Sequence, residues 1–213
     1  MILSSYYRST AAYRVRIALA LKGLEHEIKP VNLLEGAHRS SDYTANNPDG
    51  LVPTLHVENQ YLGQSMAILE YLEETYPETP ILPNTPLDRA YVRSISQTIA
   101  SDMHPLNNLR VLKYLQQDLD VSESAKTDWY HHWLKQGFMA IEQKLQSSNK
   151  SGLCVYRDSP GLADVCLIPQ LYNAHRFEFD LSDYPLINAI EKHCLSLPAF
   201  IQAHPSKQPD APL

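Results

Sequence analysis

The stretch Leu51-Val52-Pro53-Thr54-Leu55, followed by Gln64-Ser65-Met66-Ala67-Ile68, decides the fold of this chain. Pro53 has no backbone N–H, so it belongs at the start or edge of a strand and not inside a sheet. The residues after it predict a short hairpin. Ser65 is expected to cap a helix that begins at Met66.

This arrangement also predicts a binding site. A strand entered through proline leaves backbone groups of Val52 without sheet partners, and the start of a nearby helix offers N–H donors and a positive dipole end. These features suit a small peptide-like ligand that carries a carboxylate.

Residues 1–80 read as a mixed α/β domain. The sequence predicts strands at 2–7 and 27–32, a helix at 11–22 ended by Gly23, a polar segment at 35–46 with a short helix, then the hairpin and a helix at 65–76. This β-α-β-α-β-β-α order is that of a thioredoxin-like domain.

Prolines punctuate the next segment, so residues 81–87 are expected to form a linker. After it the strand signals vanish, and residues 88–213 are expected to form an all-α C-terminal domain. The predicted helices are 89–101, 105–115, 124–145, 162–177, 185–195 and 198–204.

Composition limits the partners. The 213 residues are 44% hydrophobic and carry a formal net charge of −6, which argues against nucleic acid or an anionic membrane as the main partner. No apolar run approaches the roughly 20 residues of a membrane span. Residues 1–5 lack a basic-then-apolar signal, so a cytoplasmic protein is expected.

The metal-ligating residue types do not form a convincing metal site. Cys154, Cys166 and Cys194 lie far apart with apolar neighbours, which favours inert core thiols over a disulfide framework. His131 and His132 are adjacent on a predicted helix and therefore point about 100° apart. No metal is expected.

Arg8-Ser9-Thr10-Ala11 lies between the first strand and the first helix, where ligands of open α/β folds bind. Spacing alone favours simple helix capping by the two hydroxyl groups. The same hydroxyls and the helix dipole can also lower the pKa of a bound thiol. Tyr6 and Tyr7 offer a phenol as an alternative thiol activator.

Two later clusters have equally plain interpretations. The segment 101–112 reads as a solvated helix start, and Arg176 in Asn173-Ala174-His175-Arg176-Phe177 reads as a helix-end cation. Gly161 replaces the usual Ser or Thr three residues before Asp164, so this N-cap lacks a hydroxyl and is expected to be somewhat weaker.

The continuation of the first cluster, Ala12-Tyr13-Arg14-Val15-Arg16-Ile17-Ala18-Leu19, resembles the S-x-R-V-R-I-A-L signature of zeta-class glutathione transferases, the maleylacetoacetate isomerase family. Residues 102–112 are similar to its D-x-H-P-L-N-N-L-R-V-L motif, and residues 208–212 to its Q-P-D-x-P tail. The resemblance covers nearly the whole chain. It implies the glutathione transferase fold, an α/β thioredoxin-like N-terminal domain with an all-α C-terminal domain.

The resemblance also implies the site. The class has Ser-Ser-Cys where this chain has Ser9, Thr10 and Ala11, so the thiol must come from glutathione, and either hydroxyl is a candidate to stabilise its thiolate. The implied catalytic residues are Ser9, Thr10, Arg8 and Arg176. The implied substrate-binding residues are Arg8, His104, Arg110 and Arg176. The implied glutathione-binding residues are Ser9, Thr10, Ala11, His38, Val52, Pro53, Gln64, Ser65, Asp102, His104 and Asn108.

The implied function is glutathione-dependent cis–trans isomerisation of 4-maleylacetoacetate to 4-fumarylacetoacetate, in tyrosine and phenylalanine catabolism, by reversible thiolate addition. A small dicarboxylic keto acid would be the substrate, and a homodimer is expected. Three alternatives stay open from the residues: a maleylpyruvate isomerase of gentisate breakdown, a conjugating or dehalogenating transferase, and a non-catalytic binding module with the transferase fold.

Overall fold

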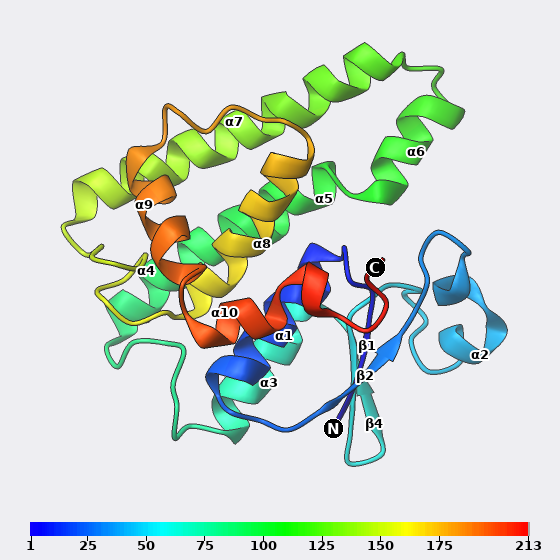
Figure 1. Ribbon diagram of the computed structural model, residues 1–213, viewed down its shortest axis with the longest axis horizontal. Helices are drawn as coiled ribbons and strands as arrows, with labels where there is room; N and C mark the ends of the chain where they lie inside the picture. The colour runs from blue at the N-terminus through cyan, green and yellow to red at the C-terminus, as the bar shows by residue number, and fades with distance from the viewer. Residues whose placement is uncertain (213) are drawn as a thin grey trace. The chain divides into compact units, whose positions relative to one another are not determined.

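The computed structural model describes residues 1–212 (Figure 1). By their internal contacts the residues form two compact units. The first unit contains Met1–Ile81 and the C-terminal segment that begins at Leu195, and the second contains Leu82–Cys194.

The first unit is built on a four-stranded sheet in the order β2-β1-β3-β4. Strand β1 pairs parallel with β2 and antiparallel with β3, and β3 and β4 form the predicted hairpin. The positive φ angles of Glu58 and Asn59 fit a tight two-residue hairpin turn. The thioredoxin-like order is confirmed. The strands are β1 (Ile2–Ser5), β2 (Glu27–Pro30), β3 (Thr54–Val57) and β4 (Gln60–Leu62).

Helix α1 (Thr10–Leu21) lies at the centre of this unit. It packs against α3 (Ser65–Thr75) and α10 (Pro198–Ala203), while α2 (Ser41–Thr44) lies on the other side of the sheet (Figure 1). The backbone N–H of Leu24 donates to Leu19 O, and that of Gly23, with φ of +66°, donates to Ala20 O. These two bonds form a Schellman motif and explain why the helix ends where Gly23 predicted. Two short 3-10 helices, η1 (Ala37–Arg39) and η3 (Pro205–Lys207), complete the unit.

A buried ion pair joins the end of α1 to α3. Lys22 Nζ lies 2.9 Å from Glu73 Oε2 and also donates to the carbonyl oxygens of Tyr76 and Thr79. The same carboxylate oxygen accepts the N–H of Ile81 at 2.9 Å. A buried charge that loses a bonding partner destabilises the fold. The bonds of Lys22 and Glu73 therefore hold the chain that follows α3 in one path.

The second unit is helical over the described residues, as expected. No helix within residues 1–212 combines the length and apolar composition needed to cross a bilayer. The helices of the second unit are α4 (Pro86–Gln97), a π-helix η2 (Thr98–Met103), α5 (His104–Leu106), α6 (Leu109–Gln117), α7 (Glu123–Ser148), α8 (Leu162–Arg176) and α9 (Pro185–Cys194).

The predicted single helix at 105–115 is wrong, because the chain breaks between α5 and α6. Asn108 has an extended backbone, and its side chain accepts the N–H of Arg110 at 3.1 Å, which makes it the N-cap of a new helix. The helix predicted at 89–101 begins earlier, at Pro86, because the Thr85 side chain caps it. This helix then continues into a π-helix, which no local sequence pattern predicted.

Gly137 explains how η2 packs against α7. A Cβ atom at this position would collide with the side chain of Met103, the last residue of η2. The absence of a side chain therefore permits the close approach of the two elements directly before His104.

Asp164 is the buried N-terminal anchor of α8. Its carboxylate accepts the N–H of Val155 at 2.8 Å and that of Gly161 at 2.9 Å, so the reach-back predicted for this motif is confirmed. Burial raises the pKa of Asp164 to about 6, against the opposing effect of these backbone donors. The three cysteines are buried, as expected for core thiols.

The raised pKa of Asp164 predicts an unusual pH dependence of stability. Between the ordinary pKa of 3.8 and about 6, the folded state holds a proton that the unfolded state has lost. Stability from this group is therefore greatest below the unfolded pKa and is lost as pH rises through the folded one.

We expect the stability difference between wild type and Asp164→Asn to fall by up to about 3 kcal/mol from acidic to neutral pH. Urea unfolding across this range measures it, with the exposed Asp158→Asn as control for loss of a carboxylate. A difference that grows with pH would contradict the assignment.

Candidate functional site

One small apolar cluster holds three loops of the first unit together. Tyr6, Val31 and Val52 are buried in it, and four partly buried side chains pack against them. These are Tyr7, Leu33, Ala37 and Tyr43. The cluster therefore brings together the loop before α1, the loop after β2 that carries His38, and the loop before β3 that carries Pro53.

The start of α1 carries the first predicted residues. Ser9 is the N-cap, and its Oγ accepts the N–H of Ala12 at 3.2 Å, so the capping interpretation is correct for this hydroxyl. Ser9 and Ala11 are partly exposed, whereas Thr10 is only 2% exposed. Arg8 is exposed and lies over the ring of Tyr7.

The peptide bond between Val52 and Pro53 is cis. The carbonyl oxygen of Leu51 is taken by the hydroxyl of Tyr43 and the amide of Asn47. Within residues 1–212, neither the N–H nor the C=O of Val52 makes a hydrogen bond, as expected for a strand entered through proline. Both groups are left for a peptide-like ligand.

The prediction that Ser65 caps a helix beginning at Met66 is wrong. Ser65 is the first helical residue and Gln64 takes the N-cap position, without a side-chain cap hydrogen bond. Gln64 has φ of +62° and ψ of 114°, a conformation that L residues rarely adopt. Its side chain donates to Asp49 Oδ2 at 2.8 Å.

Two buried arginines of this region were not among the predicted site residues. Arg14 Nη1 donates to Ser65 Oγ at 3.2 Å, and both side chains are buried. Arg16 donates to Ser5 Oγ at 2.9 Å and to Tyr7 O at 3.1 Å. The sequence signal was two arginines inside an otherwise apolar helix, which only a long-range acceptor explains.

The second unit carries the other predicted residues on consecutive elements. Asp102 lies in the π-helix η2 and is exposed, and His104 begins α5. Asn108 caps α6, and Arg110 is exposed in its first turn. Single-turn π-helical insertions often occur at functional sites, and this one directly precedes His104.

Helix α7 connects this segment to Arg176. Asn107 Nδ2 donates to Tyr130 O at 3.1 Å, and the Tyr130 ring stacks on Phe177 with centroids 3.7 Å apart. Burial raises the pKa of Tyr130, while the nearby charge of Arg176 lowers it less strongly. Arg176 is the last residue of α8, is exposed, and donates to Asn173 Oδ1 at 3.0 Å.

The histidine and cysteine groups have structural partners. His131 Nε2 lies 2.7 Å from Phe177 O, which fixes the end of α8. Ligand atoms of Cys154, Asp164 and Cys194 lie within 4.8 Å of one another, but the carboxylate already accepts two backbone N–H groups. We therefore assign a structural role, and not metal binding, to His131 and to the cluster of Cys154, Asp164 and Cys194.

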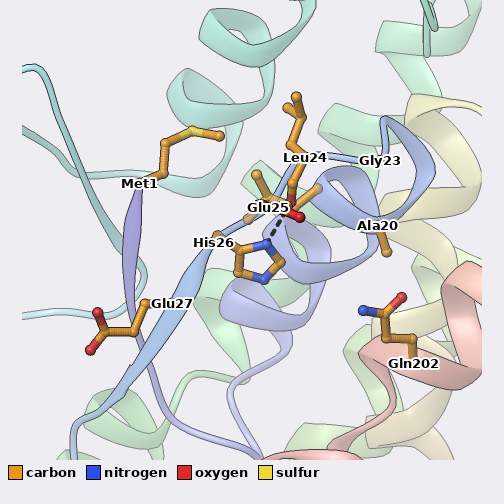
Figure 2. A pocket seen from close by; sticks show the side chains of 9 residues that line it. Met1, Ala20, Gly23, Leu24, Glu25, His26, Glu27 and Gln202 are labelled. Carbon is orange, nitrogen blue, oxygen red and sulfur yellow. Dashed lines mark hydrogen bonds between the residues drawn. The ribbon is translucent and has the colours of Figure 1, made fainter.

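A surface cavity of about 710 Å³ lies at the other end of α1. Figure 2 shows Met1, His26 and Gln202 around it, with His26 bonded to Leu24 O. Since α1 has 12 residues, this cavity is separated from Ser9 by about 18 Å of helix. Glu25 and Glu27 also line it, which disfavours an anionic ligand.

Residues 8–75 match the family described as "Glutathione S-transferase, N-terminal domain". The chain is 48% identical to a Pseudomonas aeruginosa protein named "Maleylacetoacetate isomerase", covering 100% of this chain and 99% of that protein. It superimposes with a TM-score of 0.97, at 41% identity and full coverage of both chains, on a zeta-class bacterial maleylpyruvate isomerase described as a holo structure.

A third similar protein is a maleylacetoacetate isomerase from Methylobacterium extorquens AM1, solved with bound malonate and glutathione. The TM-score is 0.96 at 36% identity, again with full coverage of both chains.

The backbone of Gln64 generates a prediction about stored strain. Gln64→Gly and Gln64→Ala both lose the hydrogen bond to Asp49, but only glycine adopts φ of +62° and ψ of 114° without steric cost. We expect the glycine variant to be more stable than the alanine variant by about 1 kcal/mol or more. Urea unfolding of the two variants measures this difference. Equal stability would show that position 64 is unstrained.

Proposed function

Because the chain belongs to the glutathione transferase family, in the zeta class of maleylacetoacetate isomerases, we propose that it is a glutathione-dependent cis–trans isomerase. Its substrate is 4-maleylacetoacetate and its product 4-fumarylacetoacetate. The observation that carries this proposal is the grouping of the Ser9 helix start and the Val52-Pro53 loop around one apolar cluster, with Ser65 tied to α1 through Arg14.

The residues of the first unit fit glutathione, a peptide with a thiol and carboxylates. The unbonded N–H and C=O of Val52 suit a peptide backbone. The start of α3 has no side-chain cap, so its N–H groups suit a carboxylate. Gln64 and Ser65 stand at this helix start, and His38 lies in the loop held by the same cluster.

We assign the thiolate-stabilising role to Ser9 in preference to Thr10. Ser9 is partly exposed and its oxygen already accepts the N–H of Ala12, so its own hydrogen remains to be donated to a ligand. Thr10 is buried. Tyr6 lies in the apolar cluster, where burial and the adjacent Tyr7 raise its pKa.

The second unit supplies cations for the acidic substrate. Arg110 and Arg176 are exposed, and the Arg176 guanidinium is oriented by Asn173. Arginine suits carboxylates because its planar group binds both oxygens. We assign Arg8, Arg110, Arg176 and His104 to binding the dicarboxylic substrate, and Asp102 and Asn108 to glutathione.

Bound glutathione would supply the thiolate nucleophile for reversible addition to the cis double bond. Ser9 and the α1 N-terminus favour the charged sulfur by donating hydrogen bonds toward it. The arginines hold the substrate carboxylates and stabilise the negative charge that develops on the keto group. Ala11 offers no competing thiol.

We propose the further assignments on family grounds. Residues 1–80 form the glutathione-binding domain, residues 81–87 the linker and residues 88–213 the helical domain, although the segment that begins at Leu195 packs within the first compact unit. The protein works as a homodimer in the cytoplasm.

A maleylpyruvate isomerase is the second candidate. The structure of a protein of that name is as similar to this chain as that of the Methylobacterium maleylacetoacetate isomerase, and each match spans the whole chain. The reaction is the same on a shorter acid, and the same residues would serve it.

The deciding experiment follows the absorbance of maleylacetoacetate and of maleylpyruvate with the purified protein, with and without glutathione. We expect turnover that requires glutathione while its total concentration stays constant over many turnovers. The acid that is turned over with the higher kcat/KM is then identified as the preferred substrate.

Glutathione loss matched one-to-one by product would instead identify a conjugating transferase. Glutathione binding without turnover of either acid would identify a binding module.

Ser9→Gly separates the chemical role of Ser9 from its capping role. Glycine is an acceptable N-cap that costs only a few tenths of a kcal/mol, whereas Ser9→Ala costs about 1 kcal/mol. We expect Ser9→Gly to raise the pKa of bound glutathione, measured by thiolate absorbance against pH, with little loss of stability. Thr10→Val is the matched control and should leave this pKa unchanged. The reverse pattern would assign the role to Thr10.

A further inference from the structure

Arg14 is a buried cation that has no assigned role in the proposed mechanism. It lies in the first half of α1, is 1% exposed, and its Nη1 donates to Ser65 Oγ at 3.2 Å across 51 residues of sequence. Moving a guanidinium out of water costs several kcal/mol, and an apolar side chain of similar size would fill the same space without that cost. The position therefore calls for a role beyond packing.

The chemistry of the pair fixes the direction of the hydrogen bond. Arginine has donors but no acceptor, so the oxygen of Ser65 must accept. A serine hydroxyl has one hydrogen, and an oxygen that accepts from Arg14 directs this hydrogen elsewhere. Ser65 is thereby held as a donor.

The position of Ser65 at the start of α3 places its hydroxyl donor where an anionic group of a ligand would bind. Ser65 is the first residue of α3, whose N-cap residue Gln64 makes no side-chain cap. The hydroxyl hydrogen and the first N–H groups of the helix are the donors that a carboxylate requires. The charge of Arg14 directly behind the hydroxyl adds to the attraction for an anion.

We propose that Arg14 is a positioning residue for glutathione, which acts through Ser65 to present a hydroxyl donor to a carboxylate of the γ-glutamyl end. This inference rests on the proposed function, since it names how that site holds its cofactor. Arg14 itself touches neither the sulfur nor the acidic substrate.

The test is a double-mutant cycle on glutathione affinity by titration calorimetry. Arg14→Met should weaken binding about tenfold or more, as expected for a hydrogen bond to a charged group. In a Ser65→Ala background the same change should weaken binding by less than about twofold, because its target has been removed. An equal loss in both backgrounds would reduce Arg14 to a packing link between α1 and α3.

A ligand change gives a second readout that a structural role would not move. The peptide 4-aminobutyryl-cysteinylglycine lacks the γ-glutamyl carboxylate, so Arg14→Met should alter its affinity by less than about twofold. A tenfold loss for this peptide would overturn the proposal.

Arg14→Lys protects the test if the methionine variant does not fold. Lysine keeps the charge and a donor, so it should bind glutathione more tightly than any neutral variant at position 14 and retain kcat at saturating glutathione. A folded lysine variant that binds as weakly as Arg14→Gln would contradict the electrostatic role.

Two results distinguish a failure of this inference from a failure of the proposed function. A wild-type protein that binds no glutathione removes the proposed function. A wild-type protein that binds and turns over, with an Arg14→Met variant of equal affinity, removes only this inference.

Discussion

The first unit depends on satisfying the guanidinium group of Arg16, which is buried in the middle of α1. Arg16 donates to Ser5 Oγ, to Tyr7 O and, from Nε, to Ala203 O at 3.1 Å. A buried cation that loses its acceptors destabilises the fold by several kcal/mol, so these acceptors are held where Arg16 needs them. They lie at the end of β1, in the loop that follows it, and in α10. The position of the loop before Ser9 therefore depends on the core as well as on its own turn, in which the N–H of Ser9 donates to Tyr6 O.

The two serines at the helix starts follow the same rule. The oxygen of Ser9 accepts from a backbone N–H, and the oxygen of Ser65 accepts from Arg14. In each case the hydroxyl oxygen accepts one hydrogen bond from inside the protein, and its single hydrogen is directed away from that donor. A hydroxyl arranged in this way is a donor before the ligand arrives, so less reorganisation is needed on binding. In the proposed site both serines would favour an anion, the glutathione thiolate at Ser9 and a carboxylate at Ser65.

The sequence predicted those features that local chemistry determines. Pro53 indicated a strand start, Gly23 a helix end, and the order of strands and helices followed from periodicity. The errors fell where a distant partner decides the outcome, as at Ser65, or where a local cap was overlooked, as at Thr85 and Asn108. Ser65 resembled an N-cap, but a donor 51 residues earlier in the chain takes its oxygen. The helix breaks at Asn108 because this residue caps α6 through Arg110 N–H, while the adjacent Asn107 bonds to the backbone of Tyr130.

The C-terminal segment shows why the glutathione-binding half is not defined by the first 80 residues alone. Ala203 accepts from Arg16, and Asp210 Oδ2 accepts the N–H of Tyr7 at 2.9 Å, so residues some 200 positions away fix the loop that carries Arg8 and Ser9. Removing that segment would leave a buried guanidinium short of an acceptor and a backbone donor unbonded. Because both losses fall on the loop that precedes α1, their first effect would be on the geometry at Ser9. The tail motif therefore helps to hold the proposed thiol site in place, although no tail residue is assigned to touch the ligand.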